Sequence, residues 1–182
     1  MSEISERYAR LADAFTAKVA AVEPDRWANP SPCEQWTARD VVRHVIEAHG
    51  TFLRLVGREL GDAPAVEDDP LAAWTAARAT VQADLEDPDR ASATYTGVFG
   101  EATFEDSIDG FICADLLIHG WDLARATGLD ETIDLDEARR VTERFKSFGD
   151  KLRGPGVLGP EIEPPPGADE QTRFLAFTGR SA

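Results

Sequence analysis

The chain has 182 residues, enough for one domain with a sizeable core, and its 34 Asp and Glu against 19 Lys and Arg give a formal net charge of −15. So acidic a surface repels phosphate backbones and anionic lipid head groups, which argues against nucleic acids and membrane surfaces as partners. No long apolar run could span a bilayer, the N-terminus does not resemble a signal peptide, and only two cysteines occur (Cys33 and Cys113), which favours a reducing cytoplasm.

Apolar side chains recur at helical spacing along most of the chain, and strand signals are few. We expect helices over residues 4–22, from Thr37 to about Val56, from Asp69 to about Leu85, from Phe104 to Thr127, from about Asp134 to Lys151 and from about Asp169 to Phe177. The second of these opens on Thr37 and Asp40 as a capping box, and the fourth stops at Gly128, a good C-terminal cap. The pattern predicts an all-α bundle that forms a single domain over residues 1–182.

Three segments rich in proline and glycine separate the predicted helices. Residues 24–36 indicate a loop, and residues 87–103 indicate an extended or looped crossover. Residues 154–167 indicate a second long loop, which we expect either to cover a site or only to connect helices.

The most informative segment is residues 108–123, which is apolar on nearly all sides and therefore belongs in the core. Asp115, His119 and Asp122 share one side of it, because steps of four and seven residues fall within roughly 40° of each other. A buried carboxylate costs several kcal/mol unless it is compensated, and a divalent cation would compensate it. The alternative is a hydrogen-bonded Asp–His pair, which is the commoner use of this spacing.

A further metal ligand would have to come from another helix. The other two histidines, His44 and His49, both lie on the second predicted helix and point roughly 140° apart, so only one of them can face the fourth helix. The apolar residues around each histidine leave both assignments open.

Two long motifs resemble those of a known family. Residues 32–44 (PCEQWTARDVVRH) resemble the "PC..WT.RD...H" block of the maleylpyruvate isomerase-like, mycothiol-dependent metalloenzymes, and residues 115–128 (DLLIHGWDLARATG) resemble their "D...H.WDLA.ATG" block. Residues 172–180 (TRFLAFTGR) resemble the C-terminal helix of the family. The blocks follow one another in the family's order over nearly the whole chain, as in its short single-domain form.

The resemblance implies a DinB/YfiT-like four-helix bundle with a long crossover and an additional C-terminal helical segment. It also implies a divalent metal held by His44, Asp115 and His119, with zinc as the usual ion and nickel or another divalent ion as alternatives. A low-molecular-weight thiol, mycothiol in this family, would occupy the open coordination positions. Asp115 departs from the glutamate of the isomerase itself, which weighs against that particular isomerisation.

The resemblance and the ligand set together predict thiol-dependent chemistry on an electrophilic small molecule, of the S-transferase or isomerase type. Asp122 would orient His119 or accept a proton, or else form a salt bridge to Arg125. Cys33 is a nucleophile candidate, although a packed thiol is the commoner role, and Cys113 belongs in the core. The rivals are a non-catalytic metal-binding or stress-related bundle and a metal-free bundle, and a homodimer is left open.

Overall fold

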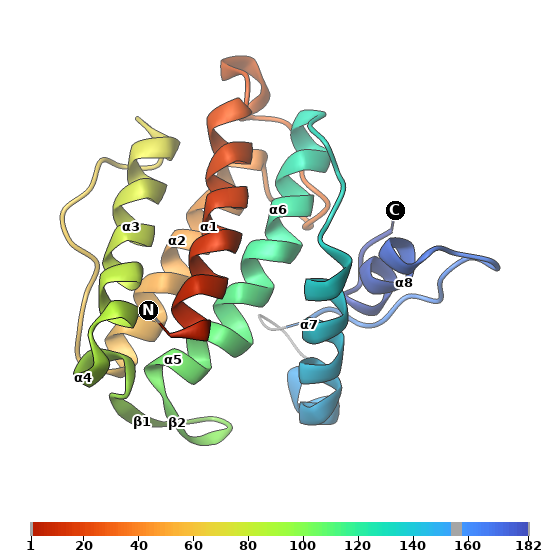
Figure 1. Ribbon diagram of the computed structural model, residues 1–182. Coiled ribbons are helices and arrows are strands. Elements are labelled where there is room, and N and C mark those ends of the chain that lie inside the picture. Colours follow the sequence, from red (N-terminus) through yellow and green to blue (C-terminus); the bar gives the residue numbers. More distant parts are fainter. Residues whose placement is uncertain (1, 154–157, 182) are drawn as a thin grey trace. The chain divides into compact units, whose positions relative to one another are not determined.

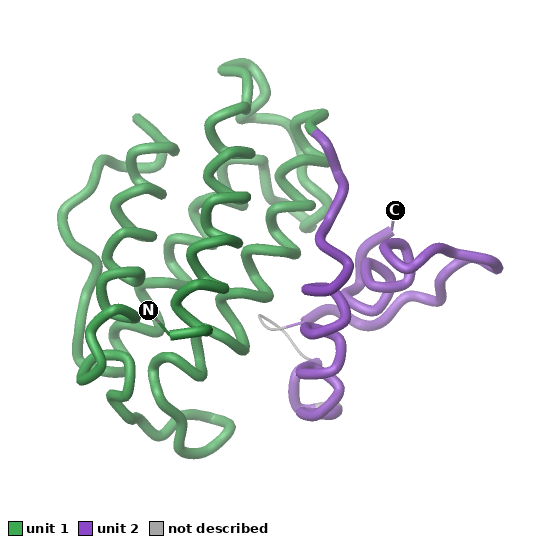
Figure 2. The backbone as a smooth tube through the Cα atoms, in the orientation of Figure 1, with its two compact units in different colours: residues 1–129 green, residues 130–182 purple. Residues whose placement is uncertain are grey.

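The computed structural model describes residues 2–153 and 158–181, and the chain divides into two compact units, residues 1–129 and 130–182 (Figure 2). The predicted all-α fold class is confirmed, because helices dominate the described residues and their one sheet is a two-stranded hairpin. That both units together make a single domain remains a prediction. Among the described residues, no helix has both the length and the apolar character needed to cross a bilayer.

The first unit is a bundle of four long helices with short elements between them. Its elements in chain order are α1 (Glu3–Ala21), η1 (Pro24–Arg26), α2 (Ala38–Leu55), α3 (Pro70–Glu86), α4 (Pro88–Ala91), β1 (Thr94–Gly97), β2 (Gly100–Thr103), α5 (Phe104–Ser107), η2 (Ile108–Ile112) and α6 (Cys113–Thr127). The helices α1 and α2 each pack against both α3 and α6, so the four long helices surround one core (Figure 1). Trp74, Tyr8 and Phe15 are among the largest fully buried side chains of that core.

The polar signals at the helix ends act as the sequence predicts. The side chain of Asp69 caps α3, which has proline in its first turn. At α2, the Thr37 hydroxyl accepts the Asp40 N–H, and the Asp40 carboxylate accepts the Thr37 N–H at 2.8 Å. Gly128 ends α6 with a φ of 76°, a left-handed conformation that costs glycine little.

The helix predicted from Phe104 to Thr127 is not one regular α-helix. The short helix α5 runs into a single π turn, η2, and only then into α6. A π turn holds more residues than an α turn, and Ile108, Phe111 and Ile112 have the spacing of an ordinary α-helix, so apolar periodicity does not reveal the turn.

Earlier in the chain, the predicted crossover at residues 87–103 contains α4 and the antiparallel hairpin of β1 and β2, with Thr94 opposite Thr103.

The second unit contains α7 (Leu135–Phe148), η3 (Gly149–Leu152) and α8 (Glu170–Phe177). The α-helix of α7 ends at Phe148, before the predicted Lys151, because Gly149 leaves the helical conformation with a φ of 59°. Phe145 of α7 and Leu175 of α8 are buried in this unit. Residues 154–157 of the predicted loop 154–167 lie outside the described residues.

Candidate metal centre

Three side chains on two neighbouring helices bring potential metal ligands together in the first unit. His44 comes from α2, and Asp115 and His119 come from α6, one helical turn apart. Their ligand atoms all lie within 4.8 Å of one another. His44 Nε2 is 3.6 Å from Asp115 Oδ2, and His119 Nε2 is 4.0 Å from Asp115 Oδ1.

The donor set fits a divalent ion of the zinc type. Imidazole nitrogen and carboxylate oxygen bind zinc at about 2.0–2.2 Å, so two ligands of one tetrahedral ion lie about 3.4 Å apart. The separations of 3.6 and 4.0 Å are close to this value, and small side-chain rotations would close the difference. The side chains of His44 and Asp115 are 34% and 30% exposed, whereas that of His119 is 8% exposed, so the group has one side open to solvent.

The electrostatics of this group favour an ionised carboxylate. Burial raises the pKa of Asp115, but the adjacent His44 imidazole and the positive charge that His119 and His44 can carry outweigh burial and leave that pKa below its usual value. An ionised carboxylate beside two imidazoles is the protonation state that a metal cation requires.

His49 is separate from this group, which decides between the two histidines of α2. It is completely buried, and its Nδ1 donates to the Val45 carbonyl at 2.7 Å while its Nε2 accepts from the Tyr8 hydroxyl at 3.0 Å. Burial lowers the pKa of His49 to about 4. His49 is therefore a neutral core side chain with both ring nitrogens in use, and His44 is the histidine of α2 that faces Asp115.

Asp122 lies at the Nδ1 edge of the His119 ring, and Asp115 lies at the Nε2 edge. Asp122 is fully buried, and its Oδ2 is 2.9 Å from His119 Nδ1. An ionised carboxylate only accepts hydrogen bonds, so Nδ1 carries the proton and the lone pair of Nε2 faces Asp115 and His44. Of the roles predicted for Asp122, the orientation of His119 is the one that this contact supports.

Two residues of the loop before α2, Trp36 and Cys33, also lie beside the group, and for Cys33 the sequence favoured a packed thiol. The ring of Trp36 is 4.8 Å from that of His44 and 6.0 Å from that of His119, so it lies against both imidazoles. Cys33 is half-buried with its Sγ 3.4 Å from Asp122 Oδ2, and it forms with His119 and Asp122 a second cluster of potential ligands. Cys113 is buried, as predicted.

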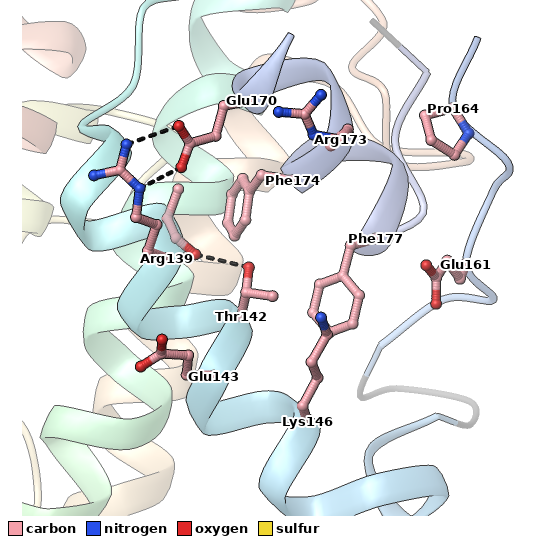
Figure 3. Close-up of a pocket in the computed structure, with 11 residues that line it drawn as sticks. Arg139, Thr142, Glu143, Lys146, Glu161, Pro164, Glu170, Arg173, Phe174 and Phe177 are labelled. Carbon is pink, nitrogen blue, oxygen red and sulfur yellow. Dashed lines mark hydrogen bonds and ion pairs between the residues drawn. The ribbon is translucent and has the colours of Figure 1, made fainter. Parts of the chain in front are cut away.

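A cavity of about 420 Å³ in the second unit contains none of these residues. It is lined by α7, α8 and the segment around Pro164 (Figure 3). Arg139 spans its rim and binds both oxygens of Glu170, at 2.5 and 2.7 Å, and Lys146 lies 5.8 Å from the Phe177 ring. The cavity is therefore bordered by charges of both signs. The Arg139–Glu170 ion pair and the contact of Lys146 with Phe177 connect α7 to α8.

Comparison with known proteins matches the chain to a described family. The sequence matches the family described as "Mycothiol maleylpyruvate isomerase N-terminal domain" over residues 8–124. Two uncharacterized proteins of Mycobacterium tuberculosis, from strains CDC 1551 / Oshkosh and H37Rv, are each 34% identical to it over 176 residues, which covers 94% of this chain and 96% of each relative. No solved structure matches the chain. The matched segment includes all of the first motif, residues 32–44, and residues 115–124 of the second, and the chain belongs to the mycothiol maleylpyruvate isomerase N-terminal domain family.

Proposed function

We propose that this protein binds one divalent metal ion through His44, Asp115 and His119 and uses it, with a low-molecular-weight thiol, to act on an electrophilic small molecule. The observation that carries the proposal is the group of three ligand atoms within 4.8 Å of one another, on a face that stays partly open to solvent. Zinc is the expected ion, with nickel or another divalent ion as alternatives. Mycothiol is the expected thiol, because the family is named for it.

The open face favours a catalytic over a closed structural site. Structural zinc sites in proteins surround the ion with four protein ligands, whereas catalytic sites use three and leave a position for water or substrate. Two imidazoles and one carboxylate match the second pattern. A divalent ion bound there would lower the pKa of a thiol or water that binds beside it.

The surrounding side chains have separate tasks in this proposal. Asp122 holds the Nδ1 proton of His119, so that the other ring nitrogen stays available as a ligand. Trp36 covers one side of both imidazoles and would contact whatever binds at the open face. The reaction would be S-transfer to the electrophile, or addition of the thiol followed by isomerisation and release.

The test starts with the metal content of protein purified without a metal-affinity tag. We expect about one equivalent of divalent metal in the wild type, loss of most of it in His44→Ala, and retention in His49→Gln, whose side chain lies in the core. Elemental mass spectrometry provides the measurement. A wild type that stays free of metal after incubation with zinc would refute the metal site.

The second step separates a catalytic ion from a structural one. In cobalt-substituted protein, an added thiol that binds the ion produces sulfur-to-cobalt charge-transfer absorption, and we expect this band to appear with mycothiol. A bound ion that accepts no thiol, and whose removal unfolds the protein, would favour the non-catalytic bundle instead.

A further inference from the structure

The loop before α2 is held in one conformation by its own backbone. Pro30 and Thr37 pair as an isolated antiparallel bridge, and the Ser31 N–H donates to the Trp36 carbonyl at 2.8 Å. Gln35 has a φ of 67°, a left-handed backbone conformation that residues other than glycine adopt only at a cost in free energy. A short segment with paired ends and one strained residue fixes the direction of the side chains between them.

This loop is also attached to the C-terminal end of α6. The Asn29 side chain donates to the Ala126 carbonyl at 2.9 Å, and the Ala38 N–H donates to the Asn29 carbonyl at 2.9 Å. The loop therefore connects the beginning of α2 to the helix that carries Asp115 and His119. Cys33 lies within the loop, close to α6.

The side chain of Cys33 meets the buried carboxylate that supports His119. Its Sγ is 3.4 Å from Asp122 Oδ2, the same oxygen that accepts the Nδ1–H of His119 at 2.9 Å. A carboxylate has no proton to give, so the thiol is the donor in this contact. The buried Asp122 carboxylate thus accepts two hydrogen bonds at the same oxygen, one from Cys33 of the loop and one from His119.

We propose that Cys33 is a positioning residue for His119. Its S–H holds the Asp122 carboxylate in the orientation that accepts Nδ1–H, which keeps Nε2 of His119 directed at Asp115 and His44. The inference rests on the proposed function, because it concerns the affinity of the same His44, Asp115 and His119 site for its metal ion. Partners of this kind, which hydrogen-bond a ligand rather than the ion, typically change metal affinity by about 10- to 100-fold, and Cys33 acts one contact further out through a weak donor.

The test is a set of zinc dissociation constants measured on the full chain by competition with a chelator. We expect Cys33→Ala to weaken zinc binding by about fivefold and Asp122→Asn by about 10-fold or more. Cys33→Ser retains a donor and should lie closer to the wild type than the alanine variant does. Cys113→Ala removes the other thiol and should bind zinc as the wild type does.

A double-mutant cycle identifies the route of the effect. If Cys33 acts through Asp122, adding Cys33→Ala to Asp122→Asn weakens binding no further, whereas independent roles give additive losses. Additive losses, or a Cys33→Ala variant with unchanged affinity, would overturn the proposal. Thermal unfolding of each metal-free variant shows whether a loss of affinity instead reflects a loss of fold.

A second readout does not depend on metal binding. Two-bond proton–nitrogen NMR spectra of the metal-free protein report which ring nitrogen of His119 carries the proton. We expect the Nδ1–H form in the wild type and Cys33→Ser, and a mixture of both forms in Cys33→Ala. If the wild type binds no zinc, the proposed function fails. A shift of the His119 proton between the two ring nitrogens in Cys33→Ala would still support the positioning role, and an unchanged proton position would overturn it.

Discussion

The three histidines of this chain show how neighbours assign different roles to one side chain. His49 has both ring nitrogens hydrogen-bonded inside the core, to Val45 and Tyr8. His119 has one nitrogen on Asp122 and the other facing Asp115, while His44 keeps about a third of its side chain exposed. In the proposed site His44 and His119 would bind the metal ion, whereas both ring nitrogens of His49 are already in use inside the core.

The buried imidazole of His49 makes stability depend on pH in a defined window. Its pKa is about 4 in the folded protein against an ordinary value of 6.5, so between these values only the unfolded chain takes up the proton. The free energy of unfolding should therefore fall as the pH is lowered from 6.5 to 4, by roughly 3 kcal/mol for this residue. Urea unfolding in the presence of a chelator, at several pH values, measures this slope.

The matched variants separate His49 from the rest of the molecule. His49→Gln should flatten the slope between pH 6.5 and 4.5, whatever its absolute stability, and His44→Gln should keep it because His49 is unchanged. The low pKa of Asp115 places its loss of charge below this window. A slope in His49→Gln equal to that of the wild type would contradict the assignment.

At the scale of elements, local signals predicted the helix ends well. Thr37 with Asp40 and Gly128 both act within a few residues, so their effect is readable without the rest of the fold. The π turn η2 was not predicted, because Ile108, Phe111 and Ile112 recur at the three- and four-residue steps of an ordinary α-helix. The hydrogen bond between Cys33 and Asp122 connects positions 89 residues apart, and no local sequence pattern encodes such a contact.

The capping box of α2 provides a test at this scale. Thr37→Ala removes the hydroxyl that accepts the Asp40 N–H and should lower the free energy of unfolding by about 1 kcal/mol. Thr51→Ala is the control, because Thr51 is exposed within the same helix and should cost less than about 0.5 kcal/mol. Equal losses in urea denaturation of the two variants would mean that the cap is not formed in solution.

At the scale of the whole molecule, the candidate site and the main core belong to the same unit. The core cluster extends from Tyr8 to Ala126, and the family match extends over residues 8–124, both inside residues 1–129. The proposed ligand set, His44, Asp115 and His119, was predicted from the resemblance of two long motifs to this family, and it stays a prediction. The division at Leu129 was not recognised, since Gly128 ends a helix in the same way within a domain as between two units.

This division predicts that the first unit is self-sufficient. A fragment ending at Leu129 contains its own core and all three ligand candidates, so we expect it to unfold cooperatively and to bind zinc within about threefold of the full chain, a difference below 1 kcal/mol. Circular dichroism melting and chelator competition measure both properties. A fragment that is unfolded, or that binds zinc far more weakly, would show that residues 130–182 support the site.

The π turn η2 also determines how the fourth bundle helix is phased. Successive residues of an α-helix are rotated by about 100°, so one residue more or fewer turns everything beyond it to another face. The turn at Ile108–Ile112 absorbs such an extra residue immediately before Asp115. Phe104 before the turn and Ile108 at its first position are buried, and Asp115 and His119 after the turn lie close to His44. The helix can thus satisfy two angular requirements that a single uninterrupted repeat would set against each other.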